Sequence, residues 1–356
     1  MSRTRRAPQA RRAPPPGRDP EPRALAAVVE ALRHYVRDVR LHEPLWRHVT
    51  LRVGGPADVL VVPHSADELR AAARVLFGQG VPFVVLGQGS NVLIADGGVR
   101  GVVVKVGKGV DRVRWDGEAV TVEAGYGLPR LAQEAARRGL AGLEFAAGIP
   151  GSVGGGVVMN AGAHGHQLAE VLDAARVVTP EGEEVLTRDA LGFAYRTSVL
   201  QQRPAVVVEA TLRLRPADPR EVRARLDAWL AQRNATQPIG PPSSGCIFRN
   251  PEGDHAGRLI DAAGLKGLSV GDAVVSEVHA NYIVNRGAAR AADVLALVEQ
   301  VRARVRERFG RELELEVKLL GDFGAGAPGA PGVPRAPGSG PHEPGRVPGG
   351  GPEASP

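Results

Sequence analysis

The sequence is poor in cysteine and contains no long hydrophobic run. Cys246 is the only cysteine among 356 residues, which excludes a disulfide within the chain and any cysteine-rich zinc or iron–sulfur site. No stretch of about 18 apolar residues is present, and the arginine- and proline-rich start has neither an apolar segment nor a small-residue cleavage site. We therefore expect a cytoplasmic protein without a membrane span or a secretion signal.

Metal ligands and a basic folded surface are also lacking. His164 and His166 have no third ligand at a suitable spacing, so no metal site is predicted. Most of the net charge of +6 comes from residues 1–23, which contain seven arginines and two acidic residues. The positive charge is therefore located mainly in this segment and not on a folded surface, and we do not expect a nucleic-acid partner.

The composition divides the chain into four parts. Residues 1–23 are rich in arginine and proline, and residues 323–356 in glycine, proline and alanine, so a disordered head and tail are expected. Asp218-Pro219-Arg220-Glu221 is typical of a helix start, with a cap, a proline in the first turn and a glutamate three residues after the cap. This signal places a boundary between a domain at 24–217 and a smaller domain at 218–322.

Two glycine-rich segments stand out, residues 87–91 (Gly-Gln-Gly-Ser-Asn) and residues 148–156. Loops without Cβ atoms allow backbone N–H groups to converge on an anion. A single loop of this kind is usually a tight turn, but two in one domain predict a diphosphate-bearing cofactor held from both sides. The first segment has no third glycine opening a long helix, so the Rossmann fingerprint is not met.

The local patterns predict a mixed α+β protein. Strand Val59–Val62, a helix capped at Ser65 and a buried strand Pro82–Leu86 form a βαβ unit that presents the first glycine segment at a sheet edge. The second segment is likewise expected to follow a strand. Further elements are expected at Ala24–Val39 (helix), Val102–Val106, Ala119–Ala124, Leu128–Arg138 (helix), Arg176–Thr179, Val206–Leu214, a helix from Asp218 to about Arg233, Arg258–Ala263 (helix), Tyr282–Asn285, Ala291–Phe309 (helix) and Leu313–Leu319.

Several motifs together resemble known flavoproteins. Thr50–Gly55, Leu86–Asn91 and Ala147–Gly155 resemble the PCMH-type FAD-binding domain of vanillyl-alcohol-oxidase-type flavoproteins. Within that group the chain resembles the shorter subtype of the UDP-N-acetylenolpyruvoylglucosamine reductases, over residues 42–320. The segments that carry this narrower resemblance are Phe193–Ser198, Ser244–Pro251, Leu259–Gly267, His279–Asn281 and Leu313–Lys318.

The resemblance implies a fold and a reaction. It implies a two-subdomain FAD-binding domain with non-covalent FAD, followed by a smaller α+β substrate domain. We expect a monomer. NADPH would be the hydride donor, and the enolpyruvyl group of UDP-N-acetylglucosamine enolpyruvate would be reduced to give UDP-N-acetylmuramate. The implied FAD-binding residues are Arg52, Gly87, Gln88, Gly89, Ser90, Asn91, Gly148, Ile149, Gly151, Ser152, Gly154, Gly155, Asn160, Gly162 and Ala163.

By the same resemblance, Arg196, Cys246 and Glu316 are the catalytic residues. Hydride addition at C3 builds negative charge that spreads into the carboxylate, and the guanidinium of Arg196 suits that charge. A mostly protonated thiol can then donate a proton to C2. The implied substrate contacts are Tyr195, Arg233, Arg249, Asn250 and Lys266, with Gln237 as a weaker candidate.

Three positions depart from the family pattern. Cys246 stands where many members have serine, Leu315 where proline is common, and Lys318 where arginine is usual. Glu316 could act as an acid or as an electrostatic group, and Glu314 is a less favoured alternative to it. The alternatives to this function are an FAD-dependent alcohol oxidase or dehydrogenase, and a non-enzymatic nucleotide-binding module.

Overall fold

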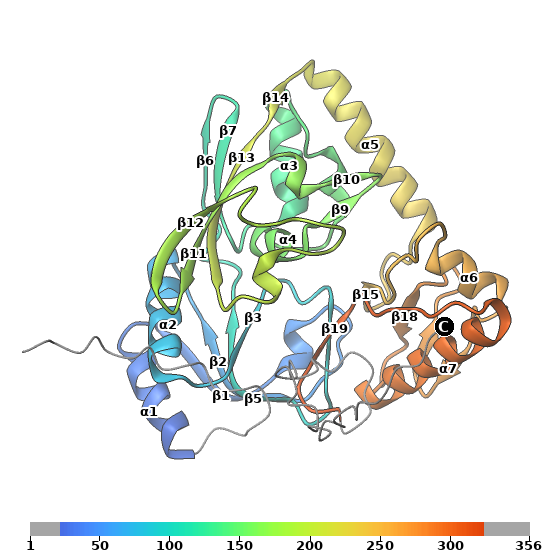
Figure 1. The fold of residues 1–356 in the computed structure, drawn as a ribbon, viewed down its shortest axis with the longest axis horizontal. Coiled ribbons are helices and arrows are strands. Elements are labelled where there is room, and N and C mark those ends of the chain that lie inside the picture. The colour runs from blue at the N-terminus through green and yellow to red at the C-terminus, as the bar shows by residue number, and fades with distance from the viewer. Residues whose placement is uncertain (1–21, 324–356) are drawn as a thin grey trace, which may run out of the picture.

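The computed structural model describes residues 22–323, which form two subdomains and a C-terminal domain (Figure 1). The expected head and tail therefore lie almost wholly outside the described residues. The first subdomain contains a sheet of order β1-β2-β5-β3, in which β1 is antiparallel to β2 and the other neighbours are parallel. Its elements are α1 (Pro22–Arg33), β1 (Asp38–Pro44), η1 (Leu45–His48), β2 (Pro56–Val62), α2 (Ala66–Gln79), β3 (Phe83–Leu86) and β5 (Val99–Lys105).

The predicted βαβ unit is present as β2, α2 and β3. The Ser65 side chain accepts a hydrogen bond from Glu68 N (3.1 Å), and α2 ends at Gly80, whose φ of 65° places it in the left-handed region. The expectation that the strand before the first glycine segment is buried was wrong. β3 is an edge strand, and Val85 in it is 41% exposed and faces the cavity described below.

The helix predicted over Ala24–Val39 is shorter than expected. α1 ends at Arg33, and Asp38–Pro44 forms β1, which pairs with β2 from Asp38 opposite Val62 to Pro44 opposite Pro56. Three consecutive residues of β1 are exposed, so its sequence shows no clear alternation. Pairing with β2, which no local pattern reveals, determines the conformation of this segment.

The second subdomain is built on an antiparallel sheet of order β12-β11-β13-β7-β6. The second glycine segment follows the 3-10 helix η2 (Glu144–Gly148), not the expected strand, and leads into α4 (Val153–Met159). Ser152 caps α4 by accepting from Gly155 N (3.4 Å). The strands are β6 (Val113–Asp116), β7 (Ala119–Glu123), β11 (Leu172–Thr179), β12 (Gly182–Thr187) and β13 (Val206–Arg213), and α3 (Leu128–Arg137) packs against η2.

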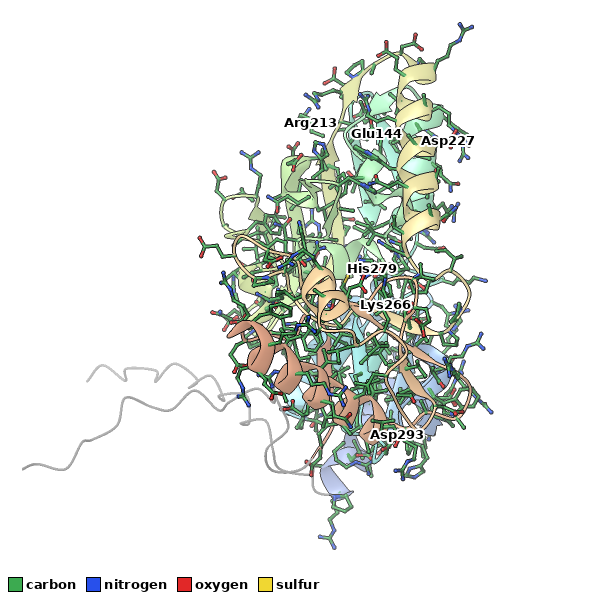
Figure 2. All side chains as sticks on the ribbon, turned by 90° about the vertical axis from the view of Figure 1, so that its right-hand side faces the viewer. Glu144, Arg213, Asp227, Lys266, His279 and Asp293 are labelled. Carbon is green, nitrogen blue, oxygen red and sulfur yellow. The ribbon has the colours of Figure 1, made fainter. Side chains whose placement is uncertain are left out.

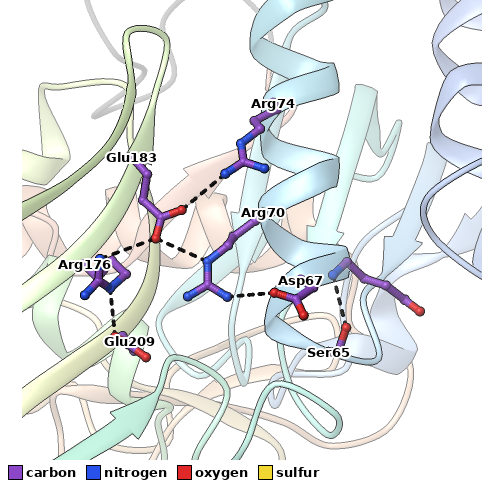
Figure 3. Close-up of polar contacts among 8 residues, drawn as sticks. Ser65, Asp67, Arg70, Arg74, Arg176, Glu183 and Glu209 are labelled. Carbon is purple, nitrogen blue, oxygen red and sulfur yellow. Dashed lines mark hydrogen bonds and ion pairs between the residues drawn. The ribbon is translucent and has the colours of Figure 1, made fainter.

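An ion-pair network joins the two subdomains (Figure 3). The carboxylate of Glu183 on β12 lies 3.3 Å from both Arg70 Nε and Arg74 Nη2 of α2 and 3.6 Å from Arg176 Nη1 of β11. Arg176 Nε also donates to Glu209 Oε1 of β13 (2.9 Å). The network fixes α2 against the edge of the second sheet.

Helix α5 (Pro219–Thr236) packs against η2 and α3 and runs from the far end of the second subdomain down to the C-terminal domain (Figure 1). Asp218 caps it by accepting from Arg220 N (2.8 Å), as predicted. The sheet of this domain has the order β15-β18-β17-β16. Its elements are β15 (Ser243–Cys246), α6 (Ala256–Ala262), β16 (Ser269–Val270), β17 (Ala273–Val275), β18 (Tyr282–Asn285) and α7 (Ala291–Phe309).

The end of the described chain returns to the first subdomain. β19 (Lys318–Leu320) pairs in parallel with β4 (Val92–Ile94), which directly follows the first glycine segment. The strand predicted over Leu313–Leu319 is thus mostly irregular, with an isolated bridge between Leu315 and Phe248. Short elements complete the fold: β8 (Leu140–Ala141), β9 (Gly162–Ala163), β10 (His166–Gln167), η3 (Leu168–Glu170), η4 (Val199–Gln201) and β14 (Arg215–Pro216).

Candidate active site

A cavity of about 780 Å³ is lined by residues of all three units. Cavities that hold cofactors and small ligands are about 300–1,000 Å³. Both glycine segments and several residues of the C-terminal domain reach it. Of the residues predicted from the sequence, those lining it are Gly87, Gln88, Gly89, Ser90, Asn91, Gly148, Ile149, Gly151, Ser152, Gly154, Gly155, Gly162, Ala163, Arg196, Arg233, Gln237, Cys246 and Glu316.

The first glycine segment is held in a shape that only glycine allows. Gly89 has φ +69°, and a Cβ there would lie 2.5 Å from His48 O. Behind the segment, Lys105 Nζ donates to His48 O (3.1 Å) and to Gly87 O. Burial lowers the pKa of Lys105 to about 8. Because this value is still above neutral pH, the side chain is mostly protonated there, and an ammonium group lies behind the loop.

The two glycine segments meet across the cavity. A Cβ on Gly87 would lie 2.5 Å from Ser152 Oγ, and one on Gly154 would lie 2.9 Å from Ala124 Cβ. Within residues 22–323, the backbone N–H groups of Gln88 and Ser90 have no hydrogen-bond acceptor. Unpartnered N–H groups beside a close, Cβ-free approach fit a diphosphate, and hence a dinucleotide such as FAD.

Arg196 and Glu316 form an ion pair at one wall of the cavity. Arg196 Nε lies 2.8 Å from Glu316 Oε1, but this buried nitrogen lacks a well-directed hydrogen bond to any described residue. Burial raises the pKa of Glu316, and the nearby guanidinium opposes that rise. The backbone of Arg196 is left-handed (φ 54°), a strained conformation that is frequent at functional sites.

Cys246 lies at the end of β15, directly opposite Tyr282 of β18. The next residue, Ile247, accepts from Glu316 N (2.8 Å), which places the Glu316 segment on its other side. Burial and the carboxylate of Glu316 raise the pKa of the Cys246 thiol to about 11, although Arg196 opposes them. The thiol is therefore protonated at neutral pH.

The remaining predicted residues do not line the cavity: Arg52, Asn160, Tyr195, Arg249, Asn250 and Lys266. Two of them lie close to the Arg196 segment. Arg249 Nη2 is 3.5 Å from Arg196 O, and the guanidinium of Arg196 is 5.4 Å from the Tyr195 ring centroid. Their assignment to the substrate stays a prediction.

The others make local contacts. Asn160 is buried, and its side chain bonds to Gln167, Ala169 and Ala194 O, so it secures the loop after α4. Asn250 Oδ1 accepts from Ala256 N (3.1 Å). Lys266 Nζ lies 2.8 Å from Asp261 Oδ2 and close to His279 of the cavity wall (Figure 2).

Three further residues at or behind the cavity wall were not found by sequence reasoning: Lys105, His279 and Tyr282. Tyr282 had a detectable signal, since a tyrosine within an apolar buried strand needs a partner for its hydroxyl. That partner is Gln237, whose Oε1 accepts from Tyr282 Oη at 2.8 Å. Within residues 22–323 no cluster of three metal-ligating side chains occurs, and no helix there is long and apolar enough to cross a bilayer.

Comparison with known proteins identifies the two halves separately. Residues 57–188 match the profile of an FAD-binding domain, and residues 237–320 match the C-terminal domain of UDP-N-acetylenolpyruvoylglucosamine reductase. The chain is similar to UDP-N-acetylenolpyruvoylglucosamine reductase 2 of Symbiobacterium thermophilum, with 48% identity over 301 residues, covering 83% of this chain and 98% of that protein. The reductase of Bacillus subtilis is 46% identical over 300 residues, covering 83% and 99%.

A solved structure shows the same arrangement. The crystal structure of UDP-N-acetylenolpyruvylglucosamine reductase from Thermus caldophilus superposes with a TM-score of 0.68 and 41% sequence identity. The match covers 80% of this chain and 98% of that one. The described part of the chain thus corresponds to nearly the whole of each of these relatives.

Proposed function

The chain belongs to the family of UDP-N-acetylenolpyruvoylglucosamine reductases, and from this premise we propose how its own residues carry out the reaction. Enzymes of this family use FAD and NADPH to reduce the enolpyruvyl ether of UDP-N-acetylglucosamine to UDP-N-acetylmuramate, in peptidoglycan precursor synthesis. Bound FAD supplies the hydride-transfer chemistry. The residues of the protein bind and orient the cofactor and the substrate, and they supply the proton to the substrate.

We assign FAD binding to the two glycine segments. Gln88 and Ser90, whose N–H groups have no acceptor within residues 22–323, line the cavity, and the ammonium of Lys105 behind the first segment adds positive charge near a bound diphosphate. Residues 148–155 would close on the cofactor from the opposite side. Arg52 and Asn160 are proposed to shape these loops, because neither lines the cavity.

Arg196 is proposed to stabilise negative charge on the substrate. Reduction at the vinyl C3 leaves charge at C2 that spreads into the carboxylate as an enolate. Arg196 Nε is buried and lacks a well-directed acceptor, so it can donate to that carboxylate once the substrate is bound. Glu316, 2.8 Å away, is proposed to hold the guanidinium in place.

Cys246 is proposed to protonate C2. Its raised pKa of about 11 keeps the proton on sulfur until a strongly basic carbanionic centre forms. The S–H bond breaks, a C–H bond forms at C2, and a thiolate remains. The observation that carries this assignment is that Arg196, Cys246 and Glu316 line one cavity together with both glycine segments.

Binding of the UDP-sugar is assigned to Tyr195, Arg233, Arg249, Asn250 and Lys266. Arg233 lines the cavity and lies against Gly148, where an added Cβ would be 2.5 Å from Arg233 Cδ. We propose that the enzyme works in the cytoplasm, where UDP-sugars and NADPH are found, and that it is a monomer without a nucleic-acid partner. The domain limits 24–217 and 218–322 remain part of this proposal.

Stopped-flow measurement of the two half-reactions tests these assignments. Cys246→Ala should still let NADPH bleach the flavin but should not form product from the enolpyruvyl ether, while Cys246→Ser should retain part of the activity. Normal turnover by Cys246→Ala would remove the thiol from the mechanism. If the reduced enzyme reacted with oxygen and showed no dependence on the UDP-sugar, the alcohol oxidase alternative would replace this function.

A further inference from the structure

Tyr282 is the polar neighbour of Cys246 that has no role in the mechanism above. The two residues are directly opposite in the antiparallel pair β15–β18, so their side chains extend from the same face of the sheet. Both line the cavity. Tyr282 is only 5% exposed, its hydroxyl lies near the Cys246 thiol, and it donates a hydrogen bond to Gln237.

The hydroxyl has one hydrogen and two neighbours. In the structure Tyr282 Oη donates its hydrogen to Gln237 Oε1 at 2.8 Å, so only the lone pairs of the hydroxyl oxygen are open to the S–H group of Cys246. A glutamine side chain can present either its oxygen or its NH₂ group to the same partner. If the Gln237 amide presents NH₂, the Tyr282 hydrogen is free to turn toward sulfur.

We propose that Tyr282 is a positioning residue that orients the Cys246 thiol before proton transfer and donates its hydroxyl hydrogen to the thiolate afterwards, with Gln237 reversing its amide. No bond of Tyr282 breaks in this step, since its hydrogen only rotates from Gln237 to sulfur. A solvent proton later restores the thiol. The inference rests on the proposed function of Cys246.

The environment of the thiol explains why such a residue is needed. Burial and the Glu316 carboxylate both disfavour a thiolate, and Arg196 is committed to Glu316 and to the substrate. A thiolate formed there without a donor would be a buried, poorly solvated anion. Burial also raises the pKa of Tyr282, so its hydroxyl stays protonated and available as a donor.

The sole cysteine of the chain permits a direct test that does not depend on turnover. In the FAD-loaded enzyme, the pH dependence of iodoacetamide alkylation reports the pKa of Cys246 alone. Tyr282→Phe should raise that apparent pKa by about one pH unit or more, because a hydrogen bond to a charged group is lost. Tyr126→Phe, which removes the hydroxyl of another buried tyrosine that donates to Glu134, should leave it unchanged.

Gln237→Met gives the opposite prediction. With no acceptor at position 237, the Tyr282 hydrogen should stay on sulfur, and the apparent thiol pKa should fall below that of the wild type. If the substitutions only loosened the site, the apparent pKa of the Cys246 thiol would shift in the same direction in both variants. An unchanged alkylation profile in Tyr282→Phe, or a shift of the same sign in both variants, would overturn the proposal.

Stopped-flow kinetics separate this inference from the assignment of Cys246. Tyr282→Phe should slow product formation about tenfold or more and leave reduction of the flavin by NADPH unchanged. If Cys246→Ala turns over normally, the proposed function of the thiol fails whatever the alkylation shows. If Cys246→Ala is inactive but Tyr282→Phe forms product at the wild-type rate, only the role of Tyr282 fails.

Discussion

Replacing Arg196 by methionine tests the central ion pair of the site. Methionine keeps much of the side-chain volume but removes the cation 2.8 Å from Glu316 Oε1. The Arg196 and Glu316 side chains are 23% and 13% exposed, so the pair is largely out of water. Removing one partner of a buried pair costs about 3–5 kcal/mol, since it leaves an uncompensated charge.

The stability loss should depend on pH in a defined direction. The pKa of Glu316 is already raised in the folded protein, and it should rise further without Arg196. A carboxyl whose folded pKa is raised binds more protons when folded, so stability falls as the pH rises from its unfolded value through its folded value. Urea unfolding of Arg196→Met should therefore show a larger loss at about pH 8 than at about pH 5.

A second substitution separates stability from catalysis. Glu316→Gln in the Arg196→Met background should restore most of the stability, because the unpaired charge is gone. It should not restore the reaction of the reduced enzyme with the enolpyruvyl ether, which should be about 10²–10³-fold slower, by analogy with the loss of one oxyanion donor. A wild-type rate for this half-reaction in Arg196→Met would refute the role of the guanidinium, and an unchanged stability would refute the buried-pair argument.

Further predictions concern the cofactor loop and the subdomain contact. Gly89→Ala should yield protein that does not retain FAD, measured by its flavin absorbance, because a Cβ would lie 2.5 Å from His48 O in a left-handed backbone (φ +69°); a yellow variant would contradict this. Lys105→Met should weaken FAD binding in a fluorescence titration. An unchanged affinity for FAD would show that the ammonium of Lys105 does not contribute to binding. The folded pKa of Lys105 is about 8 against an ordinary 10.5, so the unfolded chain binds more protons between these values. Wild-type stability should therefore rise by about 3 kcal/mol relative to Lys105→Met across that interval, and a flat difference in urea unfolding would be the opposing result. Glu183→Gln, in the exposed network of Figure 3, should cost only about 1 kcal/mol or less by urea unfolding.

Elements with strong local signals were predictable. The Ser65 and Asp218 caps mark real helix starts, and Tyr282–Asn285 and Ala291–Phe309 are found with the predicted bounds. Segments whose conformation depends on distant partners were not predictable. Pairing with β2 makes Asp38–Pro44 a strand, and residues 313–317 are held irregular by contacts with residues 247–249.

In the candidate site, too, residues within local motifs were predictable, and residues positioned by distant contacts were not. The glycine segments and the Arg196, Cys246 and Glu316 motifs could be read from the sequence through their resemblance to a family, and the structure brings all of them to one cavity. The strand expected before the second glycine segment is a 3-10 helix, and within that segment Ser152 caps α4 while Gly154 packs closely on Ala124. Lys105 and Tyr282 act through contacts with residues far along the chain, such as Lys105 with His48 and Tyr282 with Gln237, which no local motif encodes.

The return of β19 to β4 limits how the molecule can open. Lys318, Leu319 and Leu320 are in register with Val92, Leu93 and Ile94, and Ala95 N donates to Leu320 O at 2.9 Å. The C-terminal unit is thus tethered twice, by α5 at one end and by this parallel ladder at the other. A doubly tethered unit can slide by small amounts but cannot swing wide on a single hinge. The dinucleotide and the sugar nucleotide must therefore enter and leave through the opening of the cavity. Neither half of the chain can be expressed alone with all its strands paired, because β4 and β19 belong to different halves.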